Sequence, residues 1–309
     1  MKKTTKLTLL MLSVIALAFA SACNKDKPDN DTTEISKKIQ TVYYAEQSTD
    51  YNYNTEKIPI LGWNWDNDNL LESIDVYDGE SAAANVSLRI NFSYDDLQRV
   101  SRVDCYQYNF YLTYSYNNDK YQASEMNLYY KDYTTGYDIR LGSCVFTYKN
   151  DKMHLLTVTA YDFDFLKTSD LNFDVLLKPF MPAQVRESLT KLISNASQQR
   201  NGNDVYTFTV EFGWDGGNAT KINVSGMGEM ISIALQFDNK NCPLYGFILG
   251  QSGSLFKNNP VKCSISEDGY TQTMTITSQY DNDSYPIKMT AYEDGYPDET
   301  ASIYFDYFN

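Results

Sequence analysis

The sequence has a single histidine, His154, in 309 residues. A Ser-His-Asp triad could therefore be built around this position alone. The Gly-x-Ser-x-Gly elbow, the His-Glu-x-x-His motif and the phosphate-binding loop are also missing from the sequence. His154 follows a polar turn, where a surface or hairpin histidine is the simpler interpretation. We expect a protein that is not an enzyme and that uses no metal or cofactor.

Basic residues are scarce relative to acidic ones. The chain has 26 lysines and arginines against 40 aspartates and glutamates. Without residues 1–22, which hold three lysines and no acids, 23 basic residues remain and the balance is −17. Nucleic-acid binding depends on basic patches, so this deficit argues against nucleic acid as a partner. It also argues against electrostatic attachment to an anionic membrane.

Cysteine is sparse, and none of it is spaced for a metal ion. Apart from Cys23, the chain has Cys105, Cys144, Cys242 and Cys263. In an oxidising compartment an even number of thiols permits two disulfides. Small buried hydrophobic thiols are the alternative, and the sequence leaves both open.

The N-terminus has the layout of an export signal. A short basic stretch precedes an apolar run over residues 9–20, which is too short for a membrane span of about 20 residues. Small residues before Cys23 resemble a bacterial lipoprotein cleavage site, although Ala20 stands where leucine is usual. We predict that residues 1–22 are a signal peptide and that Cys23 carries the lipid that anchors the protein to a membrane. An ordinary signal peptide with an incidental Cys23 is the alternative.

The segment after the cleavage site is polar. Residues 23–40 have few apolar side chains, so we expect a flexible tether. Acidic residues after Cys23 resemble the signal that sends lipoproteins of Bacteroidota to the cell surface, with Lys27 interrupting the acids. The predicted location is the outer membrane, lipid-anchored and on the cell surface. The periplasmic face is the alternative.

Tyrosine is the most unusual part of the composition, with 27 copies. Tyrosine suits β-strands, because its ring can pack on an apolar face while its hydroxyl group contacts water. Apolar and polar residues alternate over 86–94, 110–116, 206–214 and 231–237, with polar turns between such segments. We predict a mainly β protein in which residues 41–309 form a single large domain. Its antiparallel meander makes a curved sheet or a barrel-like structure.

One region interrupts the strand pattern. Pro182 suits the first turn of a helix, and Val185, Leu189 and Ile193 then share one helical face. We predict an inserted amphipathic helix over about 182–197 that packs against the sheet. A lipid-binding helix is the alternative, but its polar face is not notably basic.

Three turn-rich segments, 237–244, 257–261 and 280–288, carry a resemblance to a known family. Their order and composition resemble secreted lipoproteins of Bacteroidota, a family of unknown function described as having a porin-like β fold. Ser284 stands where that family has glycine, and Cys242 interrupts its usual Asn-Pro pair. The resemblance implies an antiparallel, barrel-like sheet and no known activity. Because a lipid anchor and a tether precede the sheet, we expect a soluble barrel-like domain held beside the membrane rather than a pore.

Trp63 and Trp65 are the best ligand candidates. Side chains two apart on a strand point the same way, and indole rings on one face can stack on sugars. Core packing of the two rings is the alternative. The acidic turns at 66–68 and 281–283 are candidates for weak calcium binding, but they lack the glycine and distal glutamate of a calcium loop.

These features predict a lipid-anchored cell-envelope protein that acts as a non-enzymatic binding or interaction module. Its ligand is a glycan or a protein. The first alternative is a carrier that holds a lipid or another apolar ligand inside the curved sheet, with the predicted helix as a lid. The second is a glycan-active enzyme, whose carboxylate pair cannot be picked out among 40 acids.

Overall fold

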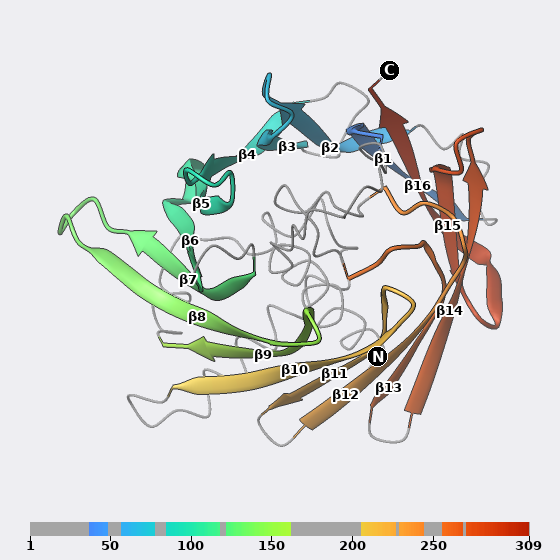
Figure 1. Ribbon diagram of the computed structural model, residues 1–309. Coiled ribbons are helices and arrows are strands. Elements are labelled where there is room, and N and C mark those ends of the chain that lie inside the picture. Colours follow the sequence, from blue (N-terminus) through green and yellow to red (C-terminus); the bar gives the residue numbers. More distant parts are fainter. Residues whose placement is uncertain are drawn as a thin grey trace.

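The chain forms a closed antiparallel β-barrel. A computed structural model describes residues 37–48, 57–77, 85–117, 122–161, 205–226, 229–243, 255–267 and 270–308. Within these residues there are sixteen strands and one 3-10 turn. Each strand pairs with its sequence neighbour, and β1 pairs with β16 to close the ring (Figure 1). The predicted antiparallel meander is confirmed, and of the two predicted forms the structure is the barrel.

The strands are between 6 and 12 residues long. The first half contains β1 (Ile39–Ser48), β2 (Ile58–Trp65), β3 (Leu71–Tyr77), β4 (Val86–Tyr94), β5 (Val100–Cys105), the 3-10 turn η1 (Tyr106–Tyr108), β6 (Phe110–Tyr116), β7 (Ala123–Lys131) and β8 (Asp138–Lys149). The second half contains β9 (Lys152–Ala160), β10 (Tyr206–Asp215), β11 (Asn218–Gly226), β12 (Glu229–Phe237), β13 (Pro260–Glu267), β14 (Tyr270–Tyr280), β15 (Pro286–Glu293) and β16 (Tyr296–Tyr307).

Strand β4 shows why these sequences form strands. Leu88 and Phe92 are buried, whereas Ser87, Arg89 and Ser93 next to them in the sequence are exposed. This period of two matches the pleat of a strand with one covered face. Phe92 lies opposite Val103 of β5, so the apolar face continues onto the next strand.

The turns are built by residues that tolerate a left-handed backbone. Asn69, Gln98, Asn150 and Ser284 have positive φ, at 65°, 59°, 54° and 66°. The predicted turns at 66–68 and 281–283 are confirmed. Glycine adopts positive φ without steric cost, so a glycine in place of Ser284 would fit this turn without strain.

Several predicted features lie outside the described residues. These are the signal peptide (1–22), Cys23, the tether up to residue 36, and the helix at about 182–197. Among the residues that the structure describes, no helix is long and apolar enough to cross a membrane.

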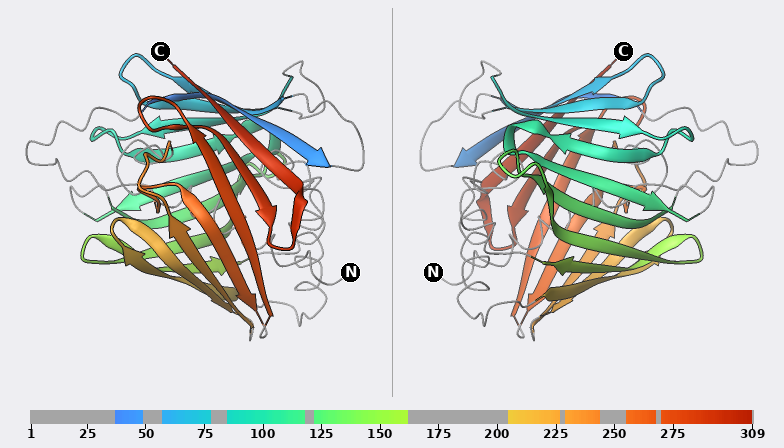
Figure 2. Two further views of the ribbon diagram at one scale, coloured as in Figure 1. Left: turned by 90° about the vertical axis from the view of Figure 1, so that its right-hand side faces the viewer. Right: turned by 90° about the vertical axis from the view of Figure 1, so that its left-hand side faces the viewer.

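The barrel has two different ends, which lie to the left and to the right of the strands in the side views of Figure 2. Lys37 precedes β1 at the end that carries the turns β2–β3, β4–β5, β8–β9, β10–β11 and β14–β15; we call it the entry end. The opposite end carries η1, the β7–β8 turn (132–137) and the β15–β16 turn; we call it the far end.

Candidate functional site

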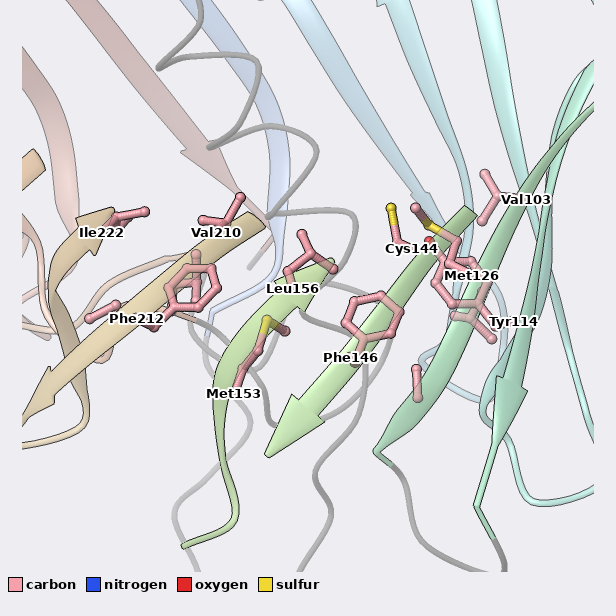
Figure 3. Close-up of a cluster of buried hydrophobic side chains, with 14 of the residues drawn as sticks. Val103, Tyr114, Met126, Cys144, Phe146, Met153, Leu156, Val210, Phe212 and Ile222 are labelled. Atoms are coloured by element: carbon pink, nitrogen blue, oxygen red, sulfur yellow. The ribbon is translucent and has the colours of Figure 1, made fainter. Parts of the chain in front are cut away.

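The inner wall of the barrel is apolar. One face of each of β5 to β11 carries buried aliphatic, aromatic and sulfur-containing side chains, which form a continuous stripe in Figure 3. The stripe follows the register: Phe146, Leu156, Val210, Val224 and Ile231 lie opposite one another on five successive strands. Because side chains two apart on a strand point to the same face, these buried side chains define one wall of the barrel, which we call the inner wall.

The outer wall is polar and carries charges at mid-strand. Arg89 of β4 pairs with Asp75 of β3 at 2.6 Å. These residues alternate with the inward-facing Val76 and Leu88, which lie opposite each other, so the ion pair is on the outer face. Asp75 is buried beneath it and also accepts from Asn64 Nδ2 at 3.0 Å. The hydrogen bonds that Arg89 donates to this carboxylate raise the pKa of Arg89.

Pairs of hydroxyl and amide side chains cover the outer wall from β10 to β16. Each pair joins side chains that face each other across two neighbouring strands at hydrogen-bonding distance. The pairs are Thr209–Ser225 (2.8 Å), Asn223–Ser232 (2.9 Å), Ser264–Thr273 (3.0 Å), Ser266–Thr271 (2.9 Å) and Thr290–Ser302 (2.9 Å). A membrane-spanning barrel has the opposite arrangement, with an apolar band outside and a polar interior.

The predicted tryptophan pair belongs to the inner wall. Trp63 is 5% exposed and packs in the core. Trp65 packs against this core, donates from Nε1 to the carbonyl oxygen of Ile39 at 3.1 Å, and lies under the Lys38 ammonium group at 5.1 Å. Both placements are those of the packing alternative.

The three turn-rich segments 237–244, 257–261 and 280–288 meet in one cluster of polar side chains. We call this cluster the polar junction and define it as Asp238, Asn241, Asn258, Asn259 and Tyr280. The Asp238 carboxylate accepts hydrogen bonds from the backbone N–H of Asn259 at 3.0 Å and from the Tyr280 hydroxyl. Asn259 Nδ2 donates to the carbonyl oxygen of Asn241 at 3.0 Å. Asn258 Nδ2 donates to the carbonyl oxygen of Lys240 at 2.9 Å. Burial and the hydrogen bond to Asp238 raise the pKa of Tyr280 to about 12.

The junction also binds neighbouring turns at the entry end. Asn241 donates from its backbone to Ser284 and from Nδ2 to Asp283, at 3.1 and 3.0 Å. Lys37, the first described residue of the chain, pairs with Asp281 and Asp283 at 2.8 and 2.5 Å. Hydrogen bonds to these two carboxylates raise the pKa of Lys37. The segments that carry the family resemblance therefore hold the entry end of the barrel together.

The thiols and acidic turns show no catalytic arrangement. Among the described residues, Cys105, Cys144, Cys242 and Cys263 form no disulfide, and the last three are buried; burial raises the pKa of Cys263 to about 11. The disulfide alternative is therefore wrong for these four thiols. Within the described ranges, no group of three or more His, Cys, Asp or Glu side chains is placed to hold a metal ion.

A stack of tyrosine and arginine side chains lies on the outer wall towards the far end. The Arg102 guanidinium lies 3.7 Å from the ring centroid of Tyr111, and Tyr111 stacks on Tyr129 with centroids 5.0 Å apart. Arg102 is paired with Asp104 at 2.7 Å, and the Tyr111 hydroxyl donates to Asp138 at 2.6 Å. Burial and this hydrogen bond raise the pKa of Tyr111 to about 12.

Exposed large apolar and aromatic side chains gather at the far end. Eight of the thirteen that the described residues expose lie there, against three at the entry end. The eight are Val86, Tyr106, Tyr133, Tyr137, Tyr161, Val205, Met230 and Tyr270. Sequence reasoning missed this gathering, although tyrosines at turn positions 106, 133 and 137 were a visible signal.

Comparison with known proteins gives a fold relationship. The chain matches a porin-like protein from Bacteroides uniformis ATCC 8492, with a TM-score of 0.50 and 11% identity over 89% of this chain and 99% of that one. The fold is similar to that of a porin-like protein. A porin-like protein from Bacteroides vulgatus ATCC 8482 matches with a TM-score of 0.47 and 10% identity, over 88% of this chain and 99% of that one.

Sequence comparisons add nothing to this. No protein-family model matches the chain, and no curated protein matches it. At 11% identity the likeness to the Bacteroides uniformis protein shows the fold alone.

Proposed function

We propose that the protein is a lipid-anchored envelope protein whose barrel stands in water beside the membrane and acts as a non-enzymatic binding module. The observation that carries this proposal is the polarity of the two walls. The outer wall has ion pairs at mid-strand and paired hydroxyl and amide side chains over seven strands. Such side chains facing lipid would each be unfavourable, and a charged one at the bilayer midplane costs about 2–4 kcal/mol.

The anchor is the predicted lipid on Cys23. Thirteen residues separate Cys23 from Lys37, enough to span up to about 45 Å when extended. Since Lys37 is paired at the entry end, a tether from this residue leads from the entry end towards the membrane. The far end, with its exposed tyrosines, then faces away from the membrane. The outer membrane, on the cell-surface side, is the location that the leader and the acidic residues after Cys23 support.

A test compares the wild-type chain with Cys23→Ser. We expect the wild type to fractionate with membranes and Cys23→Ser to be released as a soluble, folded monomer without detergent. The purified released protein should give no channel conductance in a planar lipid bilayer. If Cys23→Ser stays in the membrane fraction until detergent is added, or conducts ions, the barrel spans the membrane and the proposal is wrong. Protease treatment of intact cells separates the surface location from the periplasmic one.

The apolar inner wall favours a second candidate function. Side chains such as Val210, Ile222 and Ile233 face the interior with almost no exposure, and an apolar interior suits a carrier of lipid or another apolar ligand. Native mass spectrometry of Cys23→Ser purified without detergent tests this candidate. A carrier retains a bound lipid mass, and a protein that yields only the mass of the chain has no such role.

A further inference from the structure

The far end presents a compact group of exposed rings, which we call the tyrosine rim: Tyr106, Tyr133 and Tyr137. They are 63%, 63% and 77% exposed. Tyr106 belongs to η1, and the other two belong to the β7–β8 turn at the left edge of the ring in Figure 1. The two connections are two strands apart, or about 10 Å at the usual strand spacing.

The loops beneath the rim are fixed in place. In the β7–β8 turn, Asp132 accepts hydrogen bonds from the Thr134 hydroxyl at 2.6 Å and the Thr135 hydroxyl at 2.8 Å. The backbone N–H of Lys131 donates to the carbonyl oxygen of Asn109, directly after η1, at 2.8 Å. Hydrogen bonds from Thr134 and Thr135 hold the pKa of Asp132 at about 2. Two rigid turns joined to each other therefore present rings whose positions are set before any ligand arrives.

The two arginines beside the rim are paired with acids. Arg102 is neutralised by Asp104, and Arg140 is neutralised by Glu125 at 2.7 Å. The Lys131 ammonium group lies 5.2 Å from the ring centroid of Tyr133. In a chain of net charge −14, this one lysine supplies too little positive charge to attract a phosphate or an acidic polymer. Arg140, with Asn127 as a further partner, offers planar hydrogen-bonding groups of the kind that recognise hydroxyls.

The residues between the two rings of the β7–β8 turn are polar or lack a side chain. Thr134, Thr135 and Gly136 separate Tyr133 from Tyr137 and are exposed. A protein interface is usually centred on a desolvated, closely packed apolar or aromatic cluster, and the rim has separated rings instead. Separated ring faces among hydroxyl and amide groups suit a ligand that alternates apolar C–H faces with hydroxyls.

We propose that the tyrosine rim binds a neutral polysaccharide, with Tyr106, Tyr133 and Tyr137 covering the apolar faces of successive sugars. This inference deepens the proposed function as a binding module and rests on it. The rim lies at the end opposite Lys37, where an extended polymer outside the anchoring membrane can reach it.

Affinity electrophoresis in native gels tests the proposal with the full chain, expressed with its leader and purified from membranes in detergent. The gels contain neutral glucan, xylan, mannan, galactan or arabinan, and polygalacturonate serves as the anionic comparison. We expect at least one neutral polysaccharide to retard the wild type. The double variant Tyr133→Ala/Tyr137→Ala should bind it at least about tenfold more weakly, and Tyr137→Trp should retain binding.

The matched control is Tyr270→Ala, which removes a ring that is 76% exposed at the start of β14, outside the rim. It should bind like the wild type. All variants should melt at the wild-type temperature, since each ring is exposed. Absence of retardation by every neutral polysaccharide, equal binding by the double variant, or an equal loss in Tyr270→Ala each overturns the proposal. None of these results affects the membrane release or the conductance of Cys23→Ser. The polysaccharide proposal can therefore fail while the proposed function is upheld, and the reverse.

Discussion

Replacing Tyr280 by phenylalanine removes a single hydroxyl from the polar junction. In the wild type this hydroxyl donates to Asp238 Oδ2. Asp238 Oδ1 keeps its two backbone donors, Lys240 at 2.9 Å and Asn259 at 3.0 Å. Oδ2 keeps only a weaker contact, from Asn259 Nδ2 at 3.4 Å. The substitution thus weakens one oxygen of a partly buried carboxylate without leaving the group wholly unpaired.

The size of the effect follows from the charge on the acceptor. Hydrogen bonds to charged groups contribute about 1.5–3 kcal/mol. We expect Tyr280→Phe to lower the free energy of unfolding by about 2 kcal/mol, because part of the interaction is replaced by the remaining donors. For a domain of this size that corresponds to a melting temperature lower by about 4–8 °C.

Urea unfolding followed by tryptophan fluorescence measures the loss, with Tyr270→Phe as the control. The Tyr270 side chain is exposed, so this control should change the stability by less than about 0.5 kcal/mol. A double-mutant cycle with Asp238→Asn should give a coupling energy of about 1 kcal/mol. An additive cycle, or a loss below about 0.5 kcal/mol in Tyr280→Phe, would refute the assignment of this contact as a stabilising one.

The pKa of Tyr280 gives the same prediction a pH dependence. Burial first, and then the bond to Asp238, raise this pKa from 10.0 to about 12. A group whose pKa is raised on folding contributes its full stability below the unfolded pKa and loses it as the pH rises through the folded pKa. The stability difference between wild type and Tyr280→Phe should therefore be constant below pH 9 and shrink between about pH 10 and pH 12.

Three further outcomes are expected. Ser284→Gly relieves a left-handed backbone with φ of 66° and should raise the free energy of unfolding by about 0.5–1 kcal/mol, which thermal unfolding can check; a lower melting temperature would contradict it. Ile222→Ala opens a cavity at a fully buried inner-wall position and should cost about 3 kcal/mol in urea unfolding, whereas Ile303→Ala, at an exposed position, should cost less than about 1 kcal/mol. Thr135→Val should raise the pKa of Asp132 from about 2 towards its ordinary 3.8, and carbon NMR titration of the carboxyl group measures the shift. In the wild type, the stabilisation linked to ionised Asp132 is present above about pH 4 and is lost as the pH falls through 2.

The walls of the barrel could be predicted from the sequence because alternation is a local property. In β4, the order of Leu88, Arg89 and Ile90 already assigns each side chain to a face. Closure is not local. It depends on the register of sixteen strands together, and it is visible only when Val42 of β1 is seen opposite Phe305 of β16. A curved open sheet and a closed barrel therefore gave the same sequence pattern.

The same distinction applies to the candidate sites. The segments 237–244, 257–261 and 280–288 could be predicted as turns. Asp238 lies 21 positions before Asn259 and 42 positions before Tyr280, so only the folded barrel shows that these residues are in contact. Tyrosines such as Tyr133 and Tyr137 are ordinary in β proteins, and only their exposure at one end of the barrel distinguishes them. Trp63 drew attention by its type and packs in the core.

The pairing of β1 with β16 has a consequence for how the protein folds. Ile39 lies opposite Tyr307, so the first strand to be made is completed by the last. Contacts between residues so distant in the chain form slowly, and until β16 arrives β1 presents an unpaired edge that can join to other chains. We expect closure of this seam to be the final and slowest step of folding. The N-terminal half of the barrel must therefore be kept from aggregating until the C-terminal half has been made.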